Sequence, residues 1–431
     1  MIEDPAHQDP AHQDPAHQDP AAHVAERYRR LAARPEAFIA LRPEAEVAAE
    51  LAAVDPALPL AGLLVAVKGN IDVAGLDTTA ACPAFAYAPT EDATVVARLR
   101  AAGAVVLGTT NLDQFATGLV GTRSPYGAVR HAVDPARISG GSSSGSAVAV
   151  ALGGADLALG TDTAGSGRVP AAFHGLAGLK PTKGWVSAAG VVPACRSLDV
   201  VTVMAQDPAI ARRALDVMAG PDSRDPLSRS GSAAPFAPTA RIGVPRPGQL
   251  GELAPGWAEA FDAEVARWAA TGAALVELDI EVFLETARML YDGAFVAERY
   301  AAVGEFVDAH PDEVDPVVGG IVSRARDLPA WRLFQDQERL DRARAASDAV
   351  FERIDALLLP TTTEHPTLDA VAADPIGVNS RLGRFTNFAN LLDLAAVAYP
   401  AGVVDGLPFG VQLIGPAFSD RQLAELVWGR S

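Results

Sequence analysis

Short apolar runs alternate with longer stretches of helical periodicity along most of the chain. Two of these stretches, 91–103 and 328–354, place apolar residues at the three- and four-residue spacing that predicts helices. Strands that are separated by helices favour an α/β fold, with a mixed central β-sheet covered by helices on both faces. The apolar runs typical of buried strands are LLVAV (63–67), AVVLG (104–108), LALGT (157–161), RIGVP (241–245), ALVEL (274–278) and DALLLP (355–360).

Two segments interrupt this pattern. Residues 1–22 carry a DPAHQ repeat with a proline at every fifth position and no apolar face, which predicts a disordered tail ahead of a single catalytic domain over 23–431. Residues 219–240 are rich in proline and serine and predict a surface crossover within one fold rather than a domain boundary. The tail histidines could bind a metal weakly, although a solvated tail is favoured; they are His7, His12, His17 and His23.

Composition narrows the functional classes. The 431 residues are 49% hydrophobic and 20% charged, as expected of a soluble globular protein, and no apolar run is long enough to span a bilayer. A net charge of -18 without a basic cluster disfavours nucleic acid as a partner. Two cysteines, Cys82 and Cys195, predict reduced thiols in a cytoplasmic protein. Nothing in the sequence predicts a metal or a cofactor.

The segment 140–171, GGSSSGSAVAVALGGADLALGTDTAGSGRVPA, is dense in glycine and serine yet continues into small apolar residues. A phosphate-binding loop would explain the glycines at 140 and 145, but Ser146 stands where that motif requires lysine. A nucleophile elbow centred on Ser143 fits G-x-S-x-G, but it requires a buried strand directly before it, and 130–139 contains a proline and charged residues.

Lysine usage suggests a different chemistry. Only three of the 35 basic residues are lysine, and one of them, Lys68, ends the apolar run 63–67. Arginine keeps its proton in proteins, whereas a buried lysine can be neutral near pH 7. The pattern therefore predicts that position 68 requires an amine that can lose its proton.

Together, Lys68 in VAVKGN, Ser142 in GGSSSGSA and Ser166 in GTDTAGSGRVPA resemble the amidase signature family, whose members cleave amide bonds with a Ser-cisSer-Lys triad. The resemblance implies that Ser166 is the nucleophile, Ser142 the bridging serine beside a cis peptide bond, and Lys68 the general base. The sequence departs from the family pattern at Ser144 and Ala164, where glycine is usual, and neither is a triad position.

The glycines of the second loop suggest a function for its backbone. Small residues allow several N–H groups to approach one developing oxyanion, and the predicted donors are those of Thr163, Ala164, Gly165 and Ser166. His174 lies nearby in sequence, but its setting in AAFHGLAG predicts a packed core histidine rather than a catalytic one.

Four further segments, 78–87, 191–199, 290–300 and 383–402, resemble allophanate hydrolases. Tyr291 and Arg299 match that family's substrate-binding tyrosine and arginine, and on one continuous helix they would lie 80° apart on a shared face. The resemblance implies a small-molecule substrate, allophanate, whose carboxylate suits the planar fork of arginine. Without it, a surface ion pair of Arg299 with Glu298 or Glu305 would be favoured.

Allophanate hydrolases commonly carry a second, C-terminal domain, and this chain stops at Ser431, so the expected products are ammonia and N-carboxycarbamate. Two alternatives stay open. One is an amidase signature enzyme for a different small amide. The other is the amidase-like subunit of the tRNA-dependent amidotransferases, against which the acidity and the intact triad positions argue. A homodimer is also left open.

Overall fold

The computed structural model describes residues 19–236 and 239–429, and its centre is one mixed sheet of 11 strands in the order β1-β3-β2-β4-β6-β5-β10-β11-β9-β7-β8. All six predicted strands are present, as β2, β3, β4, β7, β8 and β9, and the predicted fold class is confirmed. The strands are β1 (Phe38–Leu41), β2 (Leu64–Lys68), β3 (Val105–Thr110), β4 (Leu157–Asp162), β5 (Ala177–Lys180), β6 (Val200–Ala205), β7 (Arg241–Pro245), β8 (Ala274–Leu278), β9 (Ala356–Pro360), β10 (Ala395–Val404) and β11 (Leu407–Gly415).

The sheet consists of two parallel parts joined by an antiparallel centre. Strand β2 pairs in parallel with β3 and β4, and β7 pairs in parallel with β8 and β9. Between them, β6, β5, β10 and β11 pair antiparallel. Strands β10 and β11 form a hairpin whose turn, Asp405–Gly406, has positive φ at both residues, as the tight turns of hairpins require.

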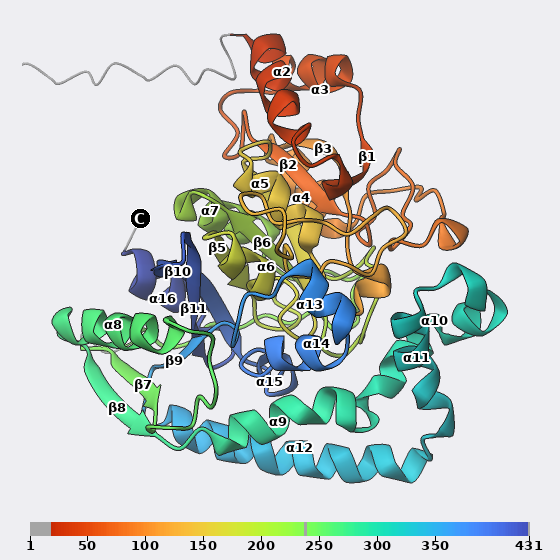
Figure 1. Ribbon diagram of the computed structural model, residues 1–431. Coiled ribbons are helices and arrows are strands. Elements are labelled where there is room, and N and C mark those ends of the chain that lie inside the picture. The colour runs from red at the N-terminus through yellow and green to blue at the C-terminus, as the bar shows by residue number, and fades with distance from the viewer. Residues whose placement is uncertain (1–18, 237–238, 430–431) are drawn as a thin grey trace, which may run out of the picture.

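Helices cover both faces of this sheet (Figure 1). The two predicted helical stretches form α4 and α12, and α9 packs along α12 at the edge of the molecule. The helices are α2 (Pro20–Leu31), α3 (Glu44–Ala52), α4 (Thr94–Ala101), α5 (Ser144–Ala151), α6 (Arg168–Phe173), α7 (Pro208–Met218), α8 (Trp257–Ala270), α9 (Glu281–Asp292), α10 (Ala297–Ala309), α11 (Pro316–Ser323), α12 (Ala330–Phe351), α13 (Leu368–Ala373), α14 (Gly377–Leu382), α15 (Phe388–Leu391) and α16 (Asp420–Trp428). Within the described ranges, none of them combines the length and apolar character needed to cross a bilayer.

The N-terminal helix begins earlier than the sequence predicts. Helix α2 starts at Pro20, and the Asp19 carboxylate accepts the N–H of Ala22, which is a standard N-cap. The boundary predicted after residue 22 is therefore about three residues late. The rest of the repeat, with His7, His12 and His17, lies outside the described residues.

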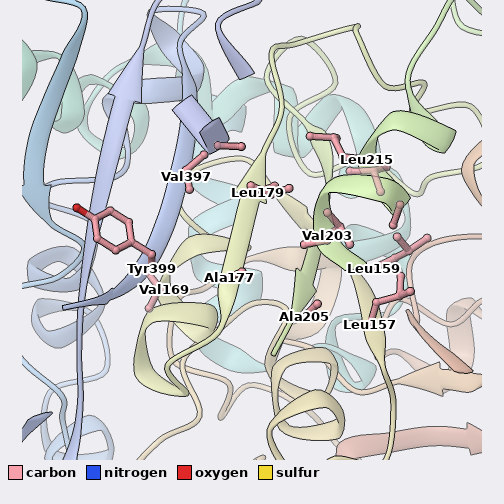
Figure 2. Close-up of a cluster of buried hydrophobic side chains, with 14 of the residues drawn as sticks. Leu157, Leu159, Val169, Ala177, Leu179, Val203, Ala205, Leu215, Val397 and Tyr399 are labelled. Atoms are coloured by element: carbon pink, nitrogen blue, oxygen red, sulfur yellow. The ribbon is translucent and has the colours of Figure 1, made fainter. Parts of the chain in front are cut away.

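The core fills both sides of the central strands. Figure 2 shows Leu157 and Leu159 of β4 beside Val203 of β6, in a cluster that also includes Leu215 of α7. The intervening Ala158 belongs to a second buried cluster on the opposite face. Because successive strand residues point to opposite faces, a strand buried on both sides reads as a continuous apolar run, which is why these strands could be recognised in the sequence.

Candidate active site

Lys68 is the last residue of β2, and its side chain is fully buried. Its Nζ donates hydrogen bonds of 2.7 Å to Ser142 Oγ and of 2.7 Å to Thr161 Oγ1. Burial lowers the pKa of Lys68 to about 7, although nearby carboxylates, that of Asp113 foremost, oppose the shift. A large fraction of this amine is therefore neutral near pH 7, and its lone pair can then accept a proton from the Ser142 hydroxyl.

The loop that carries Ser142 is held rigidly beside Lys68. The Gly141–Ser142 peptide bond is cis, and the Ser142 carbonyl accepts the N–H of Asp113 at 3.2 Å. The buried Asp113 carboxylate in turn accepts the N–H groups of Val120, Gly121 and Arg123. Ser142 therefore occupies a fixed position relative to the amine.

The two alternative interpretations of the 140–145 loop do not fit this geometry. The Ser143 hydroxyl donates to the Thr161 carbonyl and accepts the Thr161 N–H, each at 3.2 Å, so it anchors the loop to β4 and is not exposed as an elbow nucleophile is. At the start of α5, a Cβ on Gly145 would clash with the Ala37 carbonyl. The helix start is thus packed against the protein and leaves no space for a phosphate.

Ser166 lies in the turn that follows β4 and is 2% exposed. Its carbonyl accepts the N–H of Ser143 at 3.2 Å, so the two serine loops are in direct contact. Its hydroxyl donates to the Gly118 carbonyl at 3.3 Å. The structure therefore brings Ser166 to the Ser142 loop, with its hydroxyl bonded to Gly118.

The backbone of the same turn offers hydrogen-bond donors. Across the described residues, the N–H groups of Thr163, Ala164 and Ser166 form no hydrogen bond, whereas that of Gly165 donates to Asp162 Oδ1 at 2.7 Å. Gly165 has a φ of +124°, and a Cβ there would clash with the Thr386 side chain, so this position requires glycine. Three of the four predicted oxyanion donors are therefore available.

A buried ion pair fixes the turn. Both side chains of Asp162 and Arg168 are 0% exposed, and Arg168 Nε donates to Asp162 Oδ2 at 3.0 Å. The Asp162 carboxylate also accepts the N–H groups of Gly165 and Gly167. Burial alone would raise the pKa of Asp162, but Arg168 outweighs it and holds the pKa below the usual value.

Replacing Arg168 by methionine is expected to cost about 3–5 kcal/mol of folding free energy, because Asp162 is then left as an unpaired buried charge. The loss is measured as a fall in melting temperature by calorimetry. The matched control is Arg246→Met, which breaks an ion pair with Asp279 whose side chains are 56% and 52% exposed, and should cost at most about 1 kcal/mol. Equal losses in both variants would contradict the assigned importance of the buried pair.

Tyr291 and Arg299 are in contact, but not on one helix as predicted. Tyr291 is in the last turn of α9 and Arg299 is in α10, because α9 ends at Asp292 and Gly293 is extended. The Asp336 carboxylate accepts the N–H of Ala294 at 2.8 Å and stabilises this break. Arg299 donates to Tyr291 Oη at 3.2 Å, and its guanidinium lies 5.3 Å from the centre of the tyrosine ring.

Arg299 is 2% exposed, so the alternative of a surface ion pair is wrong. Glu298 bonds instead to Ser197, and no carboxylate within the described ranges forms an ion pair with Arg299. Arg299 donates to Thr117 Oγ1 at 2.9 Å, and its buried Nε has no partner. Thr117 precedes Gly118, so the guanidinium is joined to the Ser166 hydroxyl through two consecutive residues.

The remaining titratable candidates are structural. His174 Nδ1 bonds the Pro170 carbonyl, its Nε2 accepts the Ala132 N–H, and its ring stacks on His131, as predicted for a packed histidine. Cys82 and Cys195 are buried free thiols. In the part of the chain that the structure describes, no three His, Cys, Asp or Glu side chains are grouped to hold a metal ion.

Comparisons with known proteins agree with this arrangement. A sequence profile of the Amidase family matches residues 23–424. The chain is 48% identical to the urea amidolyase of Saccharomyces cerevisiae over 381 residues, which are 86% of this chain but 20% of that protein. It is 37% identical to the amidase-like subunit of the glutamyl-tRNA(Gln) amidotransferase of Symbiobacterium thermophilum, covering 95% of this chain and 87% of that one. The allophanate hydrolase structure from Kluyveromyces lactis superposes with a TM-score of 0.87 at 44% identity, over 94% of this chain and 69% of that one.

Proposed function

Because the chain belongs to the amidase family, we propose that it hydrolyses the terminal amide of allophanate, urea-1-carboxylate, and releases ammonia. The observation that carries the substrate is Arg299, a buried guanidinium with no acidic partner in the described ranges, joined to the Ser166 loop through Thr117 and Gly118. A buried cation of this kind suits a substrate that brings its own carboxylate. Similarity to allophanate hydrolase and to urea amidolyase, of which the chain spans one fifth, supports the choice.

In the proposed acylation step, neutral Lys68 accepts the proton of Ser142 while Ser142 accepts that of Ser166. The Ser166 hydroxyl leaves the Gly118 carbonyl, and Ser166 Oγ attacks the terminal carbonyl carbon. The negative charge that develops on the carbonyl oxygen is stabilised by the free N–H groups of Thr163, Ala164 and Ser166. The proton returns to the departing nitrogen as the C–N bond breaks, so ammonia leaves and an ester remains on Ser166.

Deacylation repeats the same proton path with water as the nucleophile. Water attacks the ester carbonyl, its proton passes through Ser142 to Lys68, and the bond to Ser166 Oγ breaks. The second product is N-carboxycarbamate. Throughout both steps, the Arg299 guanidinium and the Tyr291 hydroxyl hold the substrate carboxylate, which orients the terminal amide toward Ser166.

Arg299→Ala is expected to lower kcat/KM for allophanate by a factor of ten to more than a hundred, corresponding to about 1.5–3 kcal/mol for a charged hydrogen bond. Biuret has the same skeleton with a neutral amide in place of the carboxylate, so its slow turnover should change little. Arg299→Lys should recover part of the loss, because an ammonium lacks the two-pronged geometry. An equal loss on both substrates would mean that Arg299 supports the fold, and the substrate would revert to an unspecified small amide.

The direct test is ammonia release from the purified protein supplied with allophanate, with a panel of neutral amides as the comparison. Turnover of allophanate well above that of every neutral amide supports the proposal, and turnover of neutral amides alone contradicts it.

A second candidate is the amidase-like subunit of an amidotransferase, because the similarity to that protein covers 87% of its length. It predicts co-purification with partner subunits and ammonia release from glutamine. The net charge of -18 argues against direct contact with tRNA.

A further inference from the structure

A cavity of about 240 Å³ lies on the other side of Tyr291, between α9 and the residues 380–387 that follow it in space. Helices α9, α14 and α15 meet in this region (Figure 1). The cavity is next to the Ser166 turn, because Asn387 lines it and the neighbouring Thr386 donates to the Ala164 carbonyl at 2.6 Å. A molecule in this cavity therefore lies beside both Tyr291 and the loop of predicted oxyanion donors.

Three arginines line the cavity, and two of them have acidic partners. Arg288 pairs with Glu281 at 3.3 Å, and Arg381 pairs with Glu364 at 2.5 Å. Both are ordinary exposed ion pairs. The acidic residue of the lining is Asp292, which is exposed at the end of α9.

Arg384 differs from the other two arginines. It is half-buried, it forms no ion pair within the described ranges, and its Nε is buried without any hydrogen-bond partner. Its one hydrogen bond is from Nη2 to the Gln249 carbonyl at 3.1 Å, and its guanidinium lies 5.6 Å from the centre of the Phe385 ring. A donor left unpaired away from water is costly, so this geometry favours an anion that supplies the missing acceptor.

We propose that Arg384 is a second specificity-determining residue, which draws the carboxylate of the substrate into this cavity before Arg299 binds it. Tyr291 connects the two positions, since it lines the cavity and accepts a hydrogen bond from Arg299. An anion that approaches a protein of net charge -18 meets general repulsion, which a local unpaired cation counteracts. The inference rests on the proposed function for the identity of the substrate, and its ligand class is a small carboxylate.

The test compares Arg384→Gln with Arg288→Gln, a variant of a cavity arginine that already has an acidic partner. We expect Arg384→Gln to lower kcat/KM for allophanate about five- to tenfold, mainly through KM, and to make its dependence on ionic strength shallower. Biuret turnover should stay within about twofold. Arg288→Gln should change either substrate by less than about twofold. Arg384→Lys, which keeps the charge, should recover most of the salt dependence.

Equal losses on allophanate and biuret, or equal effects of the Arg384 and Arg288 variants, would overturn the inference. Calorimetric titration of allophanate into Ser166→Ala protein, with and without Arg384→Gln, gives a readout that does not require turnover. Weaker binding in the double variant supports the role of Arg384 even if the wild type does not hydrolyse allophanate, a result that would refute the proposed function alone. Unchanged binding, with unchanged melting temperatures, would refute the role of Arg384.

Discussion

Ser166→Ala is expected to lower kcat by roughly four to six orders of magnitude, because the proposed acyl-enzyme cannot form without this hydroxyl. The fold should be unaffected. The substitution removes a single oxygen whose hydrogen bond, to the Gly118 carbonyl, is long at 3.3 Å. Steady-state ammonia release gives the loss in rate, and an unchanged melting temperature shows that the variant is folded.

Ser143→Ala is the matched control, because Ser143 is a buried serine in the adjacent loop. Its hydroxyl bonds both the N–H and the carbonyl of Thr161, so its removal should cost about 1–3 kcal/mol of stability while the folded enzyme stays active. An acylating inhibitor should label Ser166, as located by mass spectrometry of the digested protein. A covalent adduct on Ser143 would refute the assignment and favour the nucleophile elbow.

Strands buried on both faces could be predicted from the sequence, whereas those of the antiparallel centre could not. The predicted strands belong to the two parallel parts of the sheet, where a continuous apolar run is the expected signature. Strand β5 spans four residues, Ala177–Lys180, and β10 contains Pro400 and Gly402, which are poor strand residues. These strands form because their neighbours pair with them, and no local pattern carries that information.

The candidate site shows the same division. Lys68, Ser142 and Ser166 could be singled out because a rare lysine and an unusual run of glycine and serine stand out locally. Thr161, which binds the amine, is on β4, and β4 pairs in parallel with β2. Its position could have been inferred only from that pairing. Thr117 and Gly118 lie in a loop without periodicity, and their contacts with Arg299 and Ser166 span 182 and 48 residues of sequence.

The contact between Tyr291 and Arg299 has a different cause from the predicted one. A continuous helix would place the two side chains on one face, but Gly293 ends α9. A Cβ at Gly293 would approach the Met289 carbonyl to 2.5 Å, so the break depends on glycine at this position. The contact arises because α10 restarts in a new direction. A glycine within an otherwise helical pattern is the local signal that could have indicated the break.

Lys68→Arg is expected to be nearly as inactive as Lys68→Ala, with kcat reduced by roughly three orders of magnitude or more. Arginine preserves the positive charge but does not release its proton, so it cannot accept one from Ser142. In the wild type, activity should rise with pH through about 7, because burial lowers the pKa of Lys68 to that value and the neutral amine is the active form. The residual activity of Lys68→Ala should lack this rise.

Lys183→Arg separates Lys68 from another lysine with a lowered pKa. Burial lowers the pKa of Lys183 to about 8, but this residue lines a different cavity, so its substitution should leave both the rate and the rise near pH 7 in place. A rise displaced or lost in Lys183→Arg would assign the titration to the wrong lysine. Substantial activity in Lys68→Arg would mean that the position needs only a positive charge, and the proton path from Ser166 through Ser142 would have to end at another group. Neutral Lys68 is the one arrangement in which a loss of charge at pH 7, a 2.7 Å contact with Ser142 and complete burial all favour the same proton transfer.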